Sequence, residues 1–349
     1  MEVVSKLLTY GRLVVQMSRP PVAAILLLFA SIAAVQVGNT LQLGWRLLPS
    51  LVIIVAILIN AAALNDLADE QIDKVNLPGA TARPLANNQA TKLQIWVLAL
   101  ASAGLAFIIS CLVGNGLVWT ALFGIGFNWA YSMKPLYISR RSILAPLLLP
   151  LAYVVTPYLI GLLSVHQSLD SQHLMLLAGL YVCFVGRILL KDFRDVEGDK
   201  LFGKTTFLLR YDRSVTCIAS SLFWVLGGAI LALLNPIFAG LFALYIPFIL
   251  VALYFLKNAK DKNAEQIIIW SIARVGTAIA IAIFALLQVV GKPLGYQVIL
   301  MLGIGVPFVG MYISALKGVV RLARPSLASS HRFVDVSKNL PVPLREPYW

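Results

Sequence analysis

Two sets of three aspartates with identical spacing are the residues of this chain best suited to chemistry. Each set reads D-x2-D-x3-D, and the members are Asp66, Asp69 and Asp73 in the first set and Asp192, Asp195 and Asp199 in the second. Together with Glu70 and Glu197, the two sets hold eight of the 15 acidic residues. Offsets of 0, 3 and 7 place three carboxylates on one face of a helix.

Carboxylates at this density predict a bound cation, because neighbouring like charges disfavour each other's ionised forms unless a cation compensates them. Carboxylate oxygens suit Mg2+, which keeps several waters and is held by a few protein carboxylates together with substrate phosphates. Each set also follows a long apolar stretch directly. The pattern therefore predicts a metal-held diphosphate at a membrane surface. One such set alone is equally well explained as a solvated helix end, but two matching sets are not.

The composition is that of a polytopic membrane protein. Sixty per cent of the residues are apolar and 12% are charged, whereas a soluble domain has roughly 25% charged residues. Ten apolar segments are long enough, or nearly so, to cross a bilayer. They are approximately 18–37, 47–64, 94–113, 115–131, 143–163, 171–190, 214–234, 236–256, 267–290 and 295–315. The expected fold is an all-α bundle of nine to ten transmembrane helices around a central cavity open to the cytoplasm.

The distribution of basic residues sets the topology. With the N-terminus in the cytoplasm, 24 of the 28 Lys and Arg residues fall on the cytoplasmic side, as the positive-inside rule requires. Both aspartate sets then lie on that side, which places the active site on the cytoplasmic face. Because the basic residues are dispersed among short loops, we expect no nucleic-acid partner. An obligate protein partner is not expected either.

The remaining polar segments predict the ends of the membrane domain. Residues 1–17 combine helical apolar spacing with two cations, which predicts an interfacial amphipathic helix. The membrane domain is expected to span 18–315 and to be followed by a polar cytoplasmic tail, 316–349. Arg187 and Arg274 lie inside predicted spans, where charge is costly. Arg187 is close enough to a helix end to snorkel, whereas Arg274 requires a partner within the bundle.

Several cations and polar groups lie beside the aspartates and are candidates for binding an anionic substrate. Arg83 follows the first set in an R-P-L loop, and its planar fork suits either a carboxylate or a phosphate. The segment 127–141 carries further polar groups at a cytoplasmic helix end. Arg194 and Lys200 are also explained by salt bridges within their own helix.

The combined motifs resemble the UbiA superfamily of intramembrane prenyltransferases. They are N-D-x2-D-x3-D, an R-P-L loop, Y-S-x-K-P-L, and K-D-x2-D-V-E-G-D-K-x2-G-K-T-T, and the resemblance covers roughly residues 15–290. It implies that carboxylates bind Mg2+ and that basic residues hold a prenyl diphosphate. The implied metal ligands are Asp69, Asp73, Asp195 and Asp199, with Asp66 and Asp192 completing the catalytic set. The implied diphosphate-binding residues are Asn65, Lys74, Arg83, Tyr131, Lys134, Arg140, Lys191 and Lys200.

The resemblance also implies the reaction, which is Mg2+-dependent transfer of a prenyl group from its diphosphate to a small-molecule acceptor, most often an aromatic quinone or meroterpenoid precursor in this family. Alternatives within the fold are cyclisation of the prenyl diphosphate and transfer to a non-aromatic acceptor, such as a glycerol phosphate or a tetrapyrrole. A remote alternative is a cation-coupled transporter. The clustering of the acids at one face disfavours a transporter, which would place charge near the midplane.

Overall fold

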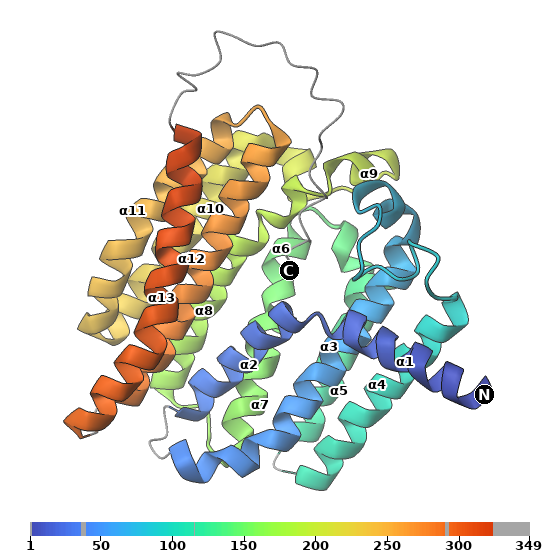
Figure 1. Cartoon of the computed structure of the whole chain (residues 1–349), viewed down its shortest axis with the longest axis horizontal. Coiled ribbons are helices and arrows are strands. Elements are labelled where there is room, and N and C mark those ends of the chain that lie inside the picture. The colour runs from blue at the N-terminus through green and yellow to red at the C-terminus, as the bar shows by residue number, and fades with distance from the viewer. Residues whose placement is uncertain (1, 36–39, 115, 290–292, 324–349) are drawn as a thin grey trace.

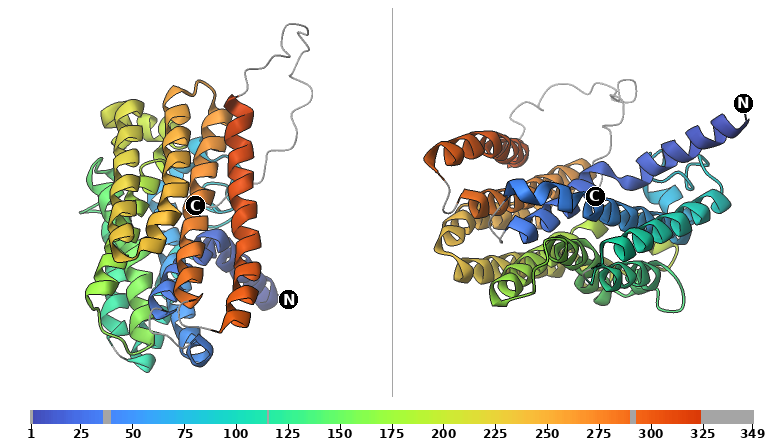
Figure 2. Two further views of the ribbon diagram at one scale, coloured as in Figure 1. Left: turned by 90° about the vertical axis from the view of Figure 1, so that its left-hand side faces the viewer. Right: turned by 90° about the horizontal axis from the view of Figure 1, so that it is seen from below.

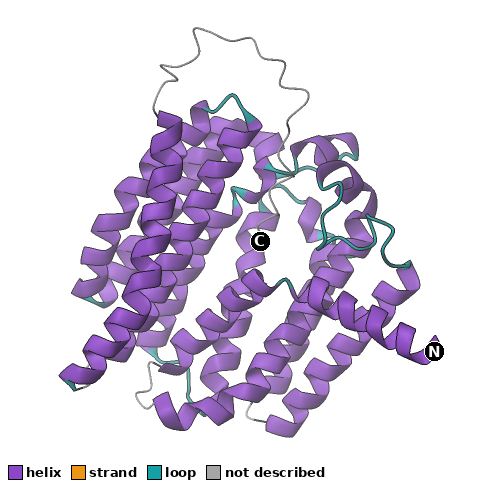
Figure 3. Ribbon diagram, in the orientation of Figure 1, coloured by secondary structure: helices purple, strands orange, loops and turns teal. Residues whose placement is uncertain are grey.

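The computed structural model describes residues 2–35, 40–114, 116–289 and 293–323, and the regular structure within them is helical (Figure 3). The longer helices are α1 (Glu2–Ser18), α2 (Pro20–Val35), α3 (Thr40–Asn76), α4 (Lys92–Val113), α5 (Leu117–Ser132), α8 (Ser171–Ile188), α10 (Phe207–Leu234), α11 (Pro236–Asn258), α12 (Lys262–Val289) and α13 (Leu294–Ala323). The shorter ones are η1 (Ile138–Arg140), α6 (Leu144–Pro150), the π-helical turn η2 (Leu151–Val155), α7 (Thr156–Ser164), η3 (Lys191–Phe193) and α9 (Val196–Leu201).

The helices form a multi-pass membrane bundle. Within the described residues, seven helices are long and apolar enough to cross a bilayer, or eight if the bent pair α1 and α2 counts as one span. The predicted number of nine to ten is therefore not reached by these measures. Two of the ten predicted segments are not among these spans. The segment 115–131 corresponds to α5, a helix of only 16 residues, and the segment 295–315 lies within α13.

Polar residues at the loop boundaries determine where several helices begin. Thr91 forms a capping box with Gln94 at the start of α4, and the Asp170 carboxylate accepts a hydrogen bond of 2.7 Å from the His173 backbone N–H at the start of α8. Thr206 caps α10 in the same way. These side chains satisfy backbone donors that the first helical turn leaves without intrahelical partners.

The bundle places the two aspartate sets at one end. In Figure 1, α10, α11, α12 and α13 stand together on one side with α8, whereas α3, α4 and α5 stand on the other. The helices α2 and α7 pack on each other between the two groups, and α12 reaches α2. Figure 2 shows the same bundle from two further sides. The end of α3 and the short helix α9 meet at one end of the bundle, so that residues far apart in sequence contact each other.

Close helix contact at the centre depends on a small residue. A Cβ atom built on Gly161 of α7 would lie 2.1 Å from the carbonyl oxygen of Ala30 in α2. Small residues of this kind let the backbones of membrane helices approach.

Gly161→Ala should therefore force α2 and α7 apart and destabilise the bundle by about 1–3 kcal/mol, the usual cost of overpacking. The measurement is thermal unfolding in detergent. Gly104→Ala, which meets no atom within 4 Å, is the matched control, and equal unfolding temperatures for the two variants would contradict the predicted contact.

The two ends of the predicted membrane domain are both helical in the structure. The polar tail was expected from residue 316, but α13 continues to Ala323 because its apolar residues persist past Leu316. Residues 324–349 lie outside the described chain. At the other end, α1 is helical over Glu2–Ser18, and its interfacial placement stays a prediction. Arg274 is exposed and donates a hydrogen bond of 2.9 Å to the hydroxyl of Ser314 on α13, which is also exposed, so the partner predicted inside the bundle is not found among the described residues.

Candidate active site

The first aspartate set lies at the end of α3, where the helix is interrupted. Asp69 has non-helical backbone angles (φ −108°, ψ 15°) within α3. Its Oδ2 accepts a hydrogen bond of 2.9 Å from the Asn65 amide, four residues earlier. The side chains of Asp69 and Asp73 are buried. Burying charged groups is costly unless they are paired, so the partners of these carboxylates define the site.

The loop after α3 folds back onto the aspartates. Asp66 Oδ2 accepts a hydrogen bond of 3.0 Å from the backbone N–H of Leu85, which fixes the R-P-L segment. Arg83 then reaches Asp73, with 2.8 Å between Arg83 Nε and Asp73 Oδ2. Burial alone would lower the pKa of Arg83, but the carboxylates of Asp73 and Asp66 raise it above its ordinary value. Asp66 therefore positions the loop, and Arg83 compensates the charge of Asp73.

The second set is divided between two short helices and a turn. Asp192 lies in η3 and is buried against Lys191, 2.6 Å from its ammonium group. Asp195 precedes α9 and pairs with Arg194 at 2.9 Å. Asp199 lies within α9 and is buried. This segment is too short and too irregular for a single helical face to carry all three carboxylates, so only two of them reach the site.

A turn after α9 delivers a lysine to both aspartate sets. Gly203 has φ +64°, a conformation that glycine adopts at little cost at a helix end. The next backbone N–H, that of Lys204, donates to the carbonyl oxygen of Asp199 at 2.8 Å. The Lys204 ammonium lies 3.0 Å from Asp69 Oδ2 and 3.7 Å from Asp199 Oδ1. One cation thus joins the two halves of the site.

The amide side chain of Asn76 joins the segments that carry the two aspartate sets. Asn76, the last residue of α3, donates a hydrogen bond of 2.8 Å to the Asp195 carbonyl oxygen and accepts one of 2.6 Å from the Gly198 N–H. A Cβ atom at Gly198 would lie 2.7 Å from the Asn76 amide. A larger residue at position 198 would therefore displace the Asn76 amide from the hydrogen bonds that join α3 to α9.

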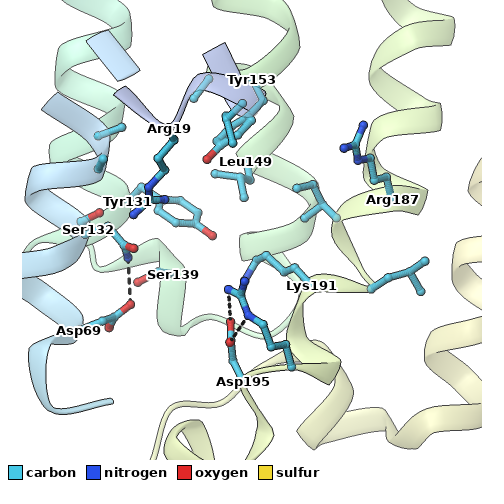
Figure 4. Close-up of a pocket in the computed structure, with 18 of the residues that line it drawn as sticks. Arg19, Asp69, Tyr131, Ser132, Ser139, Leu149, Tyr153, Arg187, Lys191 and Asp195 are labelled. Carbon is cyan, nitrogen blue, oxygen red and sulfur yellow. Dashed lines mark hydrogen bonds and ion pairs between the residues drawn. The ribbon is translucent and has the colours of Figure 1, made fainter. Parts of the chain in front are cut away.

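These elements surround a cavity of about 150 Å3 that is lined by both polar and apolar side chains. Figure 4 shows Asp69 and Asp195 on separate segments facing into this space, with Tyr131 near its centre. The polar lining includes Arg19, Asn65, Asp69, Asp73, Asn76, Arg83, Tyr131, Ser132, Ser139, Arg187, Lys191, Arg194, Asp195, Asp199 and Lys204. The apolar lining includes Val22, Ile25, Leu58, Phe127, Leu149, Phe184, Ile188, Ile269 and Ile272. Such a site fits a molecule with an anionic head and a hydrocarbon tail.

Basic side chains outnumber acidic ones around the cavity. The described lining contains six basic residues and four acidic ones. Arg19 lies at the break between α1 and α2, which are bent by 58°, and has φ +41°. Its side chain is buried, and among the described residues its Nε and Nη2 have no hydrogen-bond partner. A buried guanidinium with free donors is suited to an anion.

Arg187 is also part of the cavity. Its guanidinium carbon lies 5.6 Å from the centre of the Phe184 ring, and its Nη1 donates to the hydroxyl of Thr277 at 3.4 Å. The interpretation that Arg187 snorkels to the helix end is therefore wrong, because α8 turns this side chain inward. Figure 4 shows it across the cavity from Asp69.

Burial and neighbouring charges shift the pKa of the groups outside the spans. Burial raises the pKa of Asp199 to about 7, although Lys204 opposes this. Burial acts in the same direction on Asp195, but Arg194 lowers its pKa below the ordinary value. Burial would lower the pKa of Lys204, but Asp69 raises it above the usual range. The two carboxylates of the second set thus differ because one has a close arginine.

The structure brings eight of the predicted site residues to the cavity. They are Asn65, Asp69, Asp73, Arg83, Tyr131, Lys191, Asp195 and Asp199. Six others do not line it, namely Asp66, Lys74, Lys134, Arg140, Asp192 and Lys200. Asp66 accepts a hydrogen bond from the backbone of the loop at Leu85, and Asp192 pairs with Lys191.

The four predicted cations that do not line the cavity have other surroundings. Lys74 bonds to Glu70 at 2.8 Å. Arg140 lies over the Tyr137 ring, 4.4 Å from its centre. Lys134 and Lys200 are exposed.

Sequence reasoning did not assign Arg19, Arg187, Arg194 or Lys204 to the site. For Lys204 the sequence offered a signal, because this lysine follows Gly203, a residue typical of turns, shortly after the second aspartate set. Arg19 had one as well, since proline follows it at a helix start. For Arg187 and Arg194, no local pattern separates a cavity residue from an ordinary helix-end charge.

The donor set fits Mg2+ on the condition that another ligand contributes. Among the described residues, no three His, Cys, Asp or Glu side chains gather closely enough to hold a metal ion by themselves. Asp69 Oδ1, however, is buried without a hydrogen-bond partner, and the site offers carboxylate oxygens, which Mg2+ prefers. Mg2+ typically uses one or two carboxylates together with substrate phosphates. The residues therefore fit a metal that arrives with a diphosphate.

Comparisons with known proteins agree with this geometry. A model of the UbiA prenyltransferase family matches residues 23–272. Digeranylgeranylglyceryl phosphate synthase of Pyrococcus horikoshii is 28% identical over 204 residues, which make up 57% of this chain and 68% of that protein. The bacteriochlorophyll synthase 33 kDa chain of Rhodobacter capsulatus is 28% identical over 145 residues, or 40% of this chain and 47% of that protein. The chain thus matches about half the length of the latter relative.

A solved structure shares the fold. A UbiA homologue from Archaeoglobus fulgidus bound to DMAPP and Mg2+ has a TM-score of 0.60 at 14% identity, with coverage of 81% of this chain and 99% of that one. At this identity the likeness concerns the fold alone. Together with the family match over residues 23–272, it leads to one conclusion. This chain belongs to the UbiA prenyltransferase family and is a multi-pass membrane prenyltransferase.

Proposed function

We propose that this protein transfers a prenyl group from a prenyl diphosphate to an acceptor that carries a phosphate or a carboxylate. The single observation that carries the proposal is the lining of the cavity, which combines buried cations and carboxylates with a large number of apolar side chains. The diphosphate would lie between the two aspartate sets. Its hydrocarbon tail would extend among the apolar residues of α2, α8 and α12.

The roles of individual residues follow from their positions. Asp69, Asp73, Asp195 and Asp199 would hold Mg2+, which when bound supplies positive charge to the leaving diphosphate. Arg83 and Lys191 would bind the diphosphate and stabilise the charge that develops as the C–O bond breaks. The buried ring of Tyr131 would shield the allylic cation through a cation–π contact.

The acceptor predicted from the resemblance was an aromatic one, and the relatives favour the alternative. Their names refer to a glyceryl phosphate and to bacteriochlorophyll. The excess of basic over acidic side chains in the cavity supports an anionic acceptor. Arg19 and Arg187 lie within the lining, where their guanidinium groups can bind a phosphate or a carboxylate while the diphosphate occupies the aspartate end.

The placement in the membrane is part of the same proposal. The basic loops favour a cytoplasmic position for the end of the bundle that carries both aspartate sets. We further propose that α5 and α13 cross the bilayer, which would bring the number of spans to the predicted nine to ten.

Removal of the metal should abolish the reaction. We expect purified protein in detergent, given C10 to C20 prenyl diphosphates, to release diphosphate only when Mg2+ and a suitable acceptor are both present. EDTA should reduce the rate by a factor on the order of 1,000, because the metal provides the main charge stabilisation. Products are read by mass spectrometry with sn-glycerol phosphates, tetrapyrrole propionates and phenols as acceptors.

The outcomes separate the candidate functions. Turnover with phenols but with none of the other acceptors would show that the acceptor is aromatic, as the resemblance implies. Metal-dependent release without any acceptor, giving a hydrocarbon, would identify a cyclase. Turnover that is unchanged in EDTA would refute the metal assignment.

A further inference from the structure

We propose that Lys204 is a positioning residue that pairs with both aspartate sets and competes electrostatically with the metal for them. This inference rests on the proposed function, because it concerns what the same carboxylates do before the substrate binds. It assigns to Lys204 a competition with the metal, and the competition is measurable without turnover.

The geometry around Lys204 is that of a bridging cation. Its ammonium lies 3.0 Å from Asp69 Oδ2 and 3.7 Å from Asp199 Oδ1, and its side chain is only 9% exposed. The exposed fractions of the two carboxylate side chains are 5% and 2%. Two buried carboxylates from different halves of the chain would repel each other without a cation. Lys204 supplies that cation from within the chain.

Lys204 and a metal would compete electrostatically for these carboxylates while using different oxygen atoms. Asp69 Oδ2 is already bonded to Asn65 and Lys204, whereas Asp69 Oδ1 is buried without a hydrogen-bond partner. A metal on Oδ1 would share one carboxylate with the ammonium, and the like charges would weaken each other's binding. A diphosphate adds negative charge and relieves that repulsion. Metal alone should therefore bind weakly, and metal with diphosphate tightly.

The side chain is able to make the exchange. A lysine ammonium is a compact charge with three donors on a flexible stem, so a small movement transfers it from Asp69 to a phosphate oxygen. Its backbone stays fixed, because the Lys204 N–H is bonded to the Asp199 carbonyl after the Gly203 turn. Lys204 would thus stay beside the site in both states while its ammonium group changes partner.

The test is Mn2+ binding, followed by electron paramagnetic resonance, to purified wild type, Lys204→Met and Lys204→Gln, without and with inorganic pyrophosphate. Without pyrophosphate, we expect both variants to bind Mn2+ at least about tenfold more tightly than wild type, because the competing cation is gone. Lys204→Arg should retain the weak binding of wild type. Lys262→Met is the matched control. It removes an exposed lysine that pairs with Glu197 on the same end of the bundle, and it should bind Mn2+ as wild type does.

Unchanged or weaker Mn2+ binding by the folded Met and Gln variants would overturn the inference. If these variants unfold without metal, restoration of their thermal stability by excess Mn2+ would support it, since the metal would then replace the missing cation. Failure of excess Mn2+ to restore them would overturn it. Prenyl transfer is measured separately, so that an absence of turnover in wild type would count against the proposed function and leave the comparison of metal affinities intact.

Discussion

Asp69→Asn should lower the rate of prenyl transfer by a factor on the order of 1,000 while the protein remains a folded membrane bundle. The magnitude is that of removing a group on which electrostatic stabilisation of the transition state depends. Asp69 has a central position in the site, because Asn65 and Lys204 both donate to its Oδ2 while its Oδ1 is buried without a hydrogen-bond partner. Asparagine has almost the same shape but no charge. The measurement is diphosphate release at saturating Mg2+.

The interpretation requires a folding control and a charge control. Asp261→Asn removes a carboxylate at the same end of the bundle, where Asp261 Oδ2 accepts a hydrogen bond from the Ala264 N–H, and asparagine still caps a helix. This control should keep wild-type turnover. If Asp69→Asn elutes as a monodisperse species and turns over at a rate close to that of wild type, Asp69 is not a metal ligand.

Gly198→Ala should reduce turnover by a factor of about 10–100, the range found when groups that orient metal ligands are disturbed. The added Cβ would lie 2.7 Å from the amide atoms of Asn76, so the Asn76 side chain must leave its hydrogen bonds to Asp195 and Gly198, and α9 is then free to move away from the end of α3. That movement separates Asp199 from Asp69, although neither carboxylate is altered. The measurement is turnover as a function of Mg2+ concentration, in which the concentration required for half-maximal rate should rise.

A double-mutant cycle identifies the cause. Asn76→Ala removes the atoms with which the new Cβ collides, together with their two hydrogen bonds to the second aspartate set. Because the two changes act on one contact, their effects should not add, and the double variant should be no less active than Asn76→Ala alone. Gly203→Ala, where nothing lies within 4 Å but φ is +64°, separates backbone strain from steric collision. Additive losses in Gly198→Ala/Asn76→Ala would contradict the predicted contact.

Patterns within short stretches of the sequence predicted the class of the protein and the two aspartate sets as candidate site residues. Apolar segments long enough to span a bilayer predict helices because no other open structure satisfies the backbone there. The repeated aspartate spacing predicts a cation site because local geometry places those carboxylates on one face. A helical membrane fold was predicted in this way, whereas membership of the prenyltransferase family was predicted from the resemblance of the combined motifs. These properties depend on residues that are close together in the chain.

Which residues of each set line the cavity, and which contacts join the two sets, depends on the packing of helices that are far apart in the chain. Asp66 and Asp192 match the pattern as well as their neighbours do, yet one bonds to the loop at Leu85 and the other lies against Lys191. Lys204 and Arg19 enter the site from a turn and from a helix break. Both positions depend on packing between segments far apart in sequence, such as the contact of Asn76 with α9. Helical periodicity describes one helix face at a time, whereas the site is made by several helices that meet.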